Sequence, residues 1–143
     1  MVGLVIVTHG ELGRVMLETA QAIVQKPLPD VPVVSVDWRA PVPEIQETIR
    51  AAIRKVRDAE GVIIVTDMFG GTPSNISLSF IDEGPIVVLT GLNLPMLVVY
   101  FNYRDRMDYQ TLARHMKKRA IESIVCSLDL VPEIHSMQVG KRP

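Results

Sequence analysis

Four short apolar runs, separated by segments with helical periodicity, constrain the fold of this chain more than any other feature. Each run is rich in valine, isoleucine or leucine, which is typical of strands buried on both faces of a sheet. The runs cover residues 3–9, 32–38, 61–67 and 84–90. Strands that alternate with helices predict a parallel sheet with right-handed crossovers and helices on both faces. We therefore expect an α/β protein.

The segments between the runs predict helices. In residues 11–25, the apolar stripe of an amphipathic helix would carry Leu12, Val15, Met16, Thr19 and Ile23. Further helices are expected over residues 41–60, after Pro73, over 94–103 and over 107–123, followed by a last strand over 123–128. We interpret residues 1–130 as one domain and residues 131–143 as a polar C-terminal tail.

The composition excludes several classes of protein. A formal net charge of −1 argues against a nucleic-acid binder, because contact with phosphate backbones needs a clear basic excess. A single cysteine, Cys126, rules out an internal disulfide and fits a reducing compartment. The longest apolar tract, residues 84–101, contains Asn93 and Pro95, so a strand, a turn and a helix start explain it better than a membrane span. We expect a soluble, cytoplasmic protein.

Two polar residues mark the ends of strands that we expect to be neighbours. His9 ends the first apolar run and Asp67 ends the third. If the strand order is 2-1-3-4, these strands flank the point where the order reverses, which is where ligands bind in open α/β sheets. A carboxylate that holds the Nδ1 proton of His9 would leave the Nε2 lone pair free. Such a histidine could serve as a general base, a metal ligand or a nucleophile.

The loop after the third strand favours an anion at this position. Its sequence, FGGTPSN, offers the backbone N–H groups of Gly70 and Gly71, the hydroxyl of Thr72 and a helix start. Together with the helix that begins just after His9, these groups predict a site for a phosphoryl group. We predict no metal, because no second histidine, cysteine or carboxylate cluster stands at ligand spacing from His9. Thr8 stands where histidine phosphatases carry an arginine, so hydrolysis is not expected.

Three motifs together resemble a known family. They are VIVTHGELG at residues 5–13, TDMFGGTPSN at residues 66–75 and TGLNLPML at residues 90–97. In this order and spacing they resemble the enzyme IIA component of the mannose-family bacterial phosphotransferase system, over residues 2–125. The resemblance implies a flavodoxin-like parallel sheet in the order 2-1-3-4, flanked by helices, with the last strand exchanged across a homodimer.

The same resemblance implies a function. His9 would accept a phosphoryl group on Nε2 from the phosphohistidine of HPr and pass it to a IIB component, while Asp67 holds the other ring nitrogen. The phosphoryl oxygens would be held by Gly70, Gly71 and Thr72. The resemblance implies no cofactor, and it connects the protein to the membrane only indirectly, through a IIC/IID permease.

Apolar residues near this site are candidates for the surface that meets the partners. They are Trp38, Met68 and Phe69. Asn93 and Pro95 of the third motif are assigned a structural role near the site. Two other interpretations stay open. One is a regulatory module of an incomplete phosphotransferase system, which acts by protein binding rather than sugar transport. The other is a small-molecule binder in which the histidine is structural.

Overall fold

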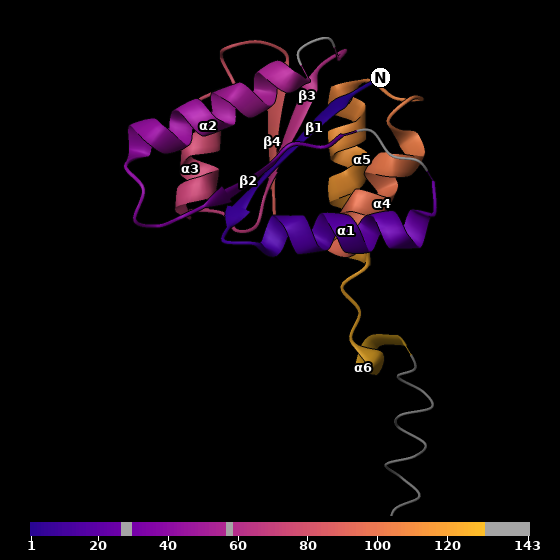
Figure 1. Cartoon of the computed structure of the whole chain (residues 1–143). Coiled ribbons are helices and arrows are strands. Elements are labelled where there is room, and N and C mark those ends of the chain that lie inside the picture. Colours follow the sequence, from indigo (N-terminus) through magenta and orange to yellow (C-terminus); the bar gives the residue numbers. More distant parts are fainter. Residues whose placement is uncertain (27–29, 57–58, 131–143) are drawn as a thin grey trace, which may run out of the picture.

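The computed structural model describes residues 1–26, 30–56 and 59–130 and has the α/β architecture expected from the sequence (Figure 1). Four parallel strands form one sheet in the order β2-β1-β3-β4. The strands are β1 (Gly3–His9), β2 (Val33–Val36), β3 (Val62–Thr66) and β4 (Ile86–Thr90). The helices are α1 (Leu12–Val24), α2 (Val42–Lys55), α3 (Thr72–Leu78), α4 (Leu94–Tyr103), α5 (Tyr109–Glu122) and α6 (Ser127–Leu130). The predicted flavodoxin-like sheet and its strand order are confirmed.

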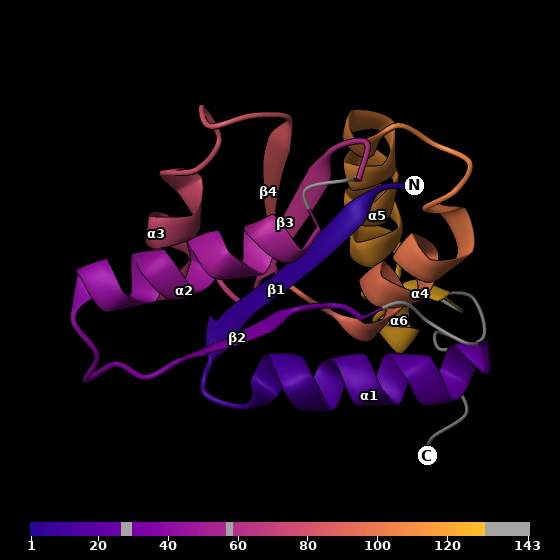
Figure 2. The same ribbon diagram turned by 45° about the horizontal axis from the view of Figure 1, so that its top comes forward.

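Side chains that alternate along β1 build two cores, one on each face of the sheet. Leu4 and Ile6 pack with side chains of α1, α4 and α5, whereas Val5 and Val7 pack with side chains of α2 and α3. Figure 2 shows the two groups of helices on opposite sides of the sheet. Because helices cover both faces of the central strands β1 and β3, these strands have continuous apolar sequences.

The register of the sheet brings the polar strand ends together. Val7 of β1 lies opposite Thr66 of β3, and His9 lies opposite Val36 of β2. His9 and Asp67, the residue after β3, therefore lie at the same edge of the sheet. From this edge α1 and α3 leave toward opposite faces, which makes it the point where the strand order reverses.

Helix α1 buries a different face from the one that the apolar pattern indicated. Its buried positions are Gly13, Leu17 and Ala20. The exposed positions include Leu12, Val15, Thr19 and Ile23, and Met16 is partly buried against the core. A Cβ on Gly13 would lie 2.7 Å from Cγ2 of Ile6, so α1 approaches β1 too closely for a larger residue at this position. The face with small side chains therefore turns inward, and the predicted stripe was wrong.

The predicted last strand over residues 123–128 is also wrong for the single chain. Residues 124–126 are irregular, and Ser127 begins the short helix α6. This segment lies away from the sheet (Figure 1), and it leaves Ile124, Val125, Leu128 and Leu130 exposed. A strand needs a neighbouring strand to satisfy its N–H and C=O groups, and none lies beside this segment within the described residues. The predicted polar tail, residues 131–143, lies outside the described residues.

The long apolar tract at residues 84–101 divides as expected. It contributes β4, the turn through Asn93 and most of α4. Among the helices in the described parts of the chain, none is long and apolar enough to cross a membrane.

Candidate functional site

One carboxylate holds His9 through two hydrogen bonds. Oδ2 of Asp67 accepts a hydrogen bond from Nδ1 of His9 at 2.7 Å and another from the backbone N–H of His9 at 2.9 Å. The second carboxylate oxygen, Oδ1, accepts the backbone N–H of Met68 at 3.0 Å. The side chain of Asp67 is 10% exposed, whereas that of His9 is 45% exposed. The imidazole ring is therefore fixed from the protein side and open to solvent on the other.

These hydrogen bonds keep Asp67 ionised. Burial alone would raise the pKa of Asp67, but the hydrogen bonds from the backbone and the ring of His9 hold this pKa below its usual value. An ionised carboxylate only accepts hydrogen bonds, so the shared proton belongs to Nδ1 and the free lone pair to Nε2. This is the arrangement of an oriented nucleophile or base. A metal ligand would need further donors, and the described residues contain no group of three or more histidine, cysteine, aspartate or glutamate side chains that could hold a metal ion.

The edge of the ring that bears Nε2 lies against the glycine loop. A Cβ built on Gly71 would stand 2.8 Å from Cε1 and 3.4 Å from Nε2 of His9. Only a residue without a side chain therefore leaves the ring in place. Gly70 has a φ of +85° and open space around it. The loop thus needs Gly70 for its backbone conformation and Gly71 for its lack of volume.

The other predicted site residues lie on the surface around this edge. Thr72 is the first residue of α3 and is exposed. Met68 and Phe69 connect Asp67 to the glycine loop with exposed side chains, Phe69 at 77%. Trp38 lies in the turn just after β2 and is 79% exposed, with the Arg39 guanidinium 5.0 Å from its ring centroid.

Comparison with known proteins identifies the family of this chain. A family model described as PTS system fructose IIA component matches residues 3–117. The chain belongs to this mannose-type IIA family of the phosphotransferase system. The family resemblance inferred from the three sequence motifs is thereby confirmed.

Known relatives of this IIA component are about one third identical to it over the aligned segments. It is 32% identical over 85 residues to the PTS system fructose-specific EIIA component of Bacillus subtilis (strain 168), covering 58% of each chain. It is also 32% identical over 110 residues to the PTS system mannose-specific EIIAB component of Escherichia coli (strain K12), covering 73% of this chain and 32% of the relative. Both matches span less than two thirds of the relative's length.

A solved structure shares the fold. The mannose/sorbose specific IIA subunit of phosphotransferase system from Enterococcus faecalis matches with a TM-score of 0.77 at 22% identity. The match covers 87% of this chain and 92% of that chain. The sheet order and its flanking helices are therefore those of a mannose-type IIA fold.

Two residues at the site of this IIA component make hydrogen bonds that were not anticipated from its sequence. Oγ1 of Thr8 accepts the backbone N–H of Gly13 at 2.8 Å, so the end of β1 caps the first turn of α1. Asn75 donates from Nδ2 to the Gly70 carbonyl at 3.2 Å and from its backbone N–H to the Gly71 carbonyl at 2.9 Å. The available signal was an asparagine in the first turn of the helix after the glycine loop, because asparagine side chains often bond to nearby backbone.

The third motif contributes structural contacts. Oδ1 of Asn93 accepts the backbone N–H of Met96 at 3.1 Å and so caps α4, while its Nδ2 donates to the carbonyl of Ala120 at 3.1 Å. Asn93 thus ties the start of α4 to the end of α5. Pro95 lies in the first turn of α4, where a missing N–H costs no helical hydrogen bond.

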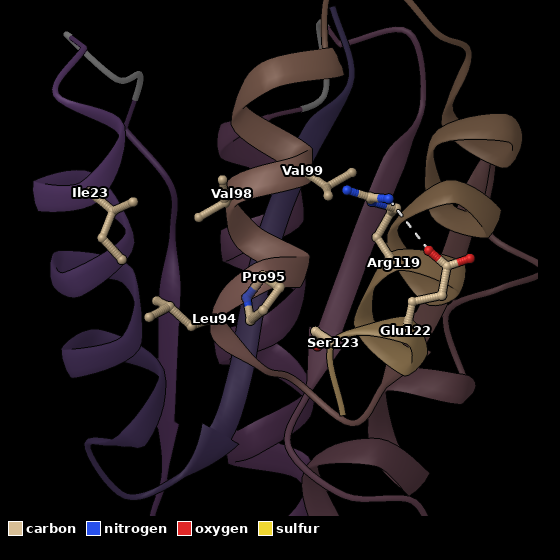
Figure 3. A pocket seen from close by; sticks show the side chains of 8 residues that line it. All are labelled: Ile23, Leu94, Pro95, Val98, Val99, Arg119, Glu122 and Ser123. Carbon is tan, nitrogen blue, oxygen red and sulfur yellow. Dashed lines mark hydrogen bonds and ion pairs between the residues drawn. The ribbon is translucent and has the colours of Figure 1, made fainter. Parts of the chain in front are cut away.

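A groove of about 430 Å³ lies elsewhere on the IIA component, between α1, α4 and α5 (Figure 3). The side chains of Ile23, Leu94 and Val98 line it. Arg119 and Glu122 form an ion pair of 3.4 Å on its α5 side. Pro95 of the third motif lines this groove, whereas His9, Asp67 and the glycine loop do not, so the groove is separate from the site at the end of β1.

Proposed function

We propose that His9 of this IIA component accepts a phosphoryl group on Nε2 from phospho-HPr and passes it to a IIB component. One observation carries the proposal: an exposed imidazole, held through Nδ1 by Asp67, has its Nε2 edge beside a loop without side-chain volume at Gly71. A site for a small substrate is usually an enclosed, mostly apolar cavity. An open histidine with a free Nε2 suits transfer between two proteins better.

The transfer is an in-line displacement at phosphorus. The Nε2 lone pair of His9 forms a new P–N bond while the P–N bond to the donor histidine breaks, and that electron pair returns to the donor ring. The ring of His9, still protonated at Nδ1, gains positive charge in this step. The Asp67 carboxylate, 2.7 Å from Nδ1, stabilises that charge. Transfer to IIB is the same displacement with His9 as the leaving group, so no further base is needed.

The glycine loop would supply donors for the phosphoryl oxygens. The backbone N–H groups of Gly70 and Gly71 and the hydroxyl of Thr72 follow one another along the loop. Phosphoryl transfer depends mainly on positioning and on dipoles aimed at the equatorial oxygens. We propose that these three donors of the loop meet this requirement.

The surface around His9 suits partners that dock briefly. Besides Trp38, Met68 and Phe69, the first turns of α1 expose Leu12 and Val15. A small apolar patch around an open histidine supports a transient interface rather than a permanent one. We propose that HPr and IIB use this patch in turn, because both must reach the same ring nitrogen.

The name of one relative supports the proposal that a IIB component is the acceptor. The E. coli relative is named an EIIAB component, which agrees with a IIB component as the acceptor. We propose that the protein works in the cytoplasm and reaches the membrane only through a IIC/IID permease.

We also propose that a second copy of this chain completes the sheet. The outer edge of β4 is unpaired among the described residues, and a groove of about 280 Å³ beside it is lined by Val87, Leu89 and residues of α5. Residues 123–128 carry exposed Ile124 and Val125 and could extend along this edge in a partner. Light scattering should then show a dimer for the wild type and a monomer for the double variant Ile124→Asp, Val125→Asp. A monomeric wild type would contradict the strand exchange.

Intact-mass spectrometry tests the carrier proposal. After incubation with phosphoenolpyruvate, enzyme I and HPr, the wild type should gain one acid-labile phosphoryl group and His9→Ala none. Addition of a IIB component should remove the group. If HPr is phosphorylated but the wild type gains nothing, the carrier function is wrong. A stable gain without onward transfer would instead favour the regulatory module.

A further inference from the structure

We infer that Asn75 is a positioning residue for phosphoryl transfer, because it fixes the Gly70–Gly71 peptide so that the Gly71 N–H is presented to a phosphoryl group on His9. The inference rests on the proposed function and deepens it. Asn75 acts through the loop backbone and need not touch the phosphoryl group itself.

Asn75 holds two successive carbonyl groups. Its Nδ2 donates to the Gly70 carbonyl at 3.2 Å, and its backbone N–H donates to the Gly71 carbonyl at 2.9 Å. These carbonyls belong to the two peptide planes on either side of the Gly71 Cα. The bond to the Gly71 carbonyl is the ordinary i→i−4 bond of the helix start, which any residue other than proline makes at this position. The Asn75 side chain itself therefore holds only the Gly70–Gly71 plane.

The orientation of the first plane determines where the Gly71 N–H points. The described residues contain no cis peptide bond, and in a trans peptide the C=O and N–H point in opposite directions. Since the Gly70 carbonyl points at Asn75, the Gly71 N–H points away from it. None of the hydrogen bonds between described residues uses this N–H. The Cβ position of Gly71 lies only 3.4 Å from Nε2 of His9, so the residue that bears this N–H adjoins the nitrogen that would be phosphorylated.

The loop needs such a restraint because its own residues cannot supply it. Gly70 has no side chain and its Cβ position lies in open space, so its own backbone can take several conformations and does not fix this peptide. In the reversed orientation the Gly70 carbonyl oxygen would replace the N–H as the group facing the phosphoryl oxygens. A partial negative charge at that place would repel the group that the N–H attracts.

The peptide orientation can be measured without any phosphoryl donor. The residual dipolar coupling of the Gly71 N–H reports its direction in the unphosphorylated protein. We expect the wild-type coupling to match the direction in the structure, and the Asn75→Ala coupling to change or average toward zero. Asn102→Ala makes the same chemical change at an exposed position of α4 and should leave the coupling unchanged. Equal couplings in the wild type and Asn75→Ala would overturn the inference.

The rate of phosphorylation tests the consequence. Phosphoramidate, a small phosphoryl donor that needs no docking surface, and phospho-HPr should both phosphorylate Asn75→Ala about tenfold more slowly than the wild type or Asn102→Ala. The Gly71 amide signal should also shift on phosphorylation in the wild type and shift less in Asn75→Ala. Equal rates and equal shifts would overturn the inference. If neither donor phosphorylates the wild type, the carrier function fails, while the dipolar couplings still decide whether Asn75 orients the peptide.

Discussion

Replacing Asp67 with asparagine should slow phosphorylation of His9 strongly while leaving the fold intact. The aspartate accepts three hydrogen bonds: from the ring and the backbone of His9 on one oxygen, and from the Met68 N–H on the other. An amide of the same shape has only one acceptor oxygen. In either orientation, therefore, its NH₂ group faces at least one backbone N–H that the carboxylate satisfied.

The two possible orientations of the amide in Asp67→Asn set the limits of the expected loss of phosphorylation rate. If the amide oxygen of the new side chain faces His9, the imidazole keeps its tautomer but loses its negatively charged partner. A charge-assisted hydrogen bond is stronger than a neutral one by about 1–1.5 kcal/mol, which corresponds to roughly tenfold in rate. With its NH₂ toward His9, the amide donates to Nδ1 and moves the proton to Nε2, which removes the nucleophilic lone pair. In catalytic triads the loss of the correct tautomer costs about 10⁴-fold. We expect Asp67→Asn to fall between these limits.

Rapid-quench kinetics with phospho-HPr measures this loss, and ¹⁵N NMR of the His9 ring nitrogens identifies the tautomer. The wild type should carry its proton on Nδ1, and a larger rate loss in Asp67→Asn should accompany a larger fraction of Nε2–H. A phosphorylation rate within about threefold of the wild type would refute the orienting role of Asp67.

The same residue predicts how stability depends on pH. Burial raises the pKa of Asp67, but the hydrogen bonds from His9 outweigh this and hold the pKa in the folded state below its unfolded value. A lowered carboxyl pKa contributes stability that is present above the unfolded pKa and is lost as pH falls through the folded pKa. Urea unfolding should therefore show the advantage of the wild type over Asp67→Asn shrinking as pH falls below about 4. A constant difference in the free energy of unfolding across this range would contradict the lowered pKa.

Further substitutions, with their controls, test three separate contacts. Gly71→Ala, whose Cβ would stand 2.8 Å from the imidazole, should slow phosphorylation about 100-fold. Gly70→Ala should mainly lower the free energy of unfolding, by about 1–2 kcal/mol, because of the positive φ at this position. Equal phosphorylation rates in the two variants would contradict the steric role of Gly71. Phe69→Ala should raise the KM for phospho-HPr about tenfold with little change in melting temperature, and an unchanged KM would remove this side chain from the docking surface. Thr8→Val should lower the free energy of unfolding by about 1–3 kcal/mol because it leaves the buried Gly13 N–H unpaired. Thr8→Ser keeps the hydroxyl and serves as the control. An equal loss of unfolding free energy in both variants would show that the hydroxyl does not stabilise the protein.

Much of the fold could be predicted because its signals are local. The apolar runs that became β1 and β3 are buried on both faces, so their sequences needed no knowledge of their neighbours. Alternation of strands with helices then leaves few topologies. His9 and Asp67 could be placed together once the strand order was inferred, because parallel strands end at a common edge. Their hydrogen bond itself needed the structure.

Other parts failed where the outcome depends on what a segment packs against. Helix α1 has two stripes with apolar residues, and periodicity alone could not tell which one faces the sheet. The close approach of α1 to β1 at Gly13 selected the face with small residues. Residues 123–128 have a strand-like sequence, yet a strand forms only beside another strand, and the described chain offers none there.

By itself, the sequence determined the four strands of the sheet and the pair of polar residues at their ends, because these follow from residue type and spacing along the chain. The three motifs indicated the family and, through that resemblance, the order of the strands. Only the tertiary structure decided which face of α1 is buried, that Gly71 makes room for the imidazole, and that Asn75 holds the loop. These features depend on distances between segments that are separate in sequence. The residue type specifies a side chain's volume and hydrogen-bonding capacity. Which atoms the side chain contacts depends on how the helices and strands pack together.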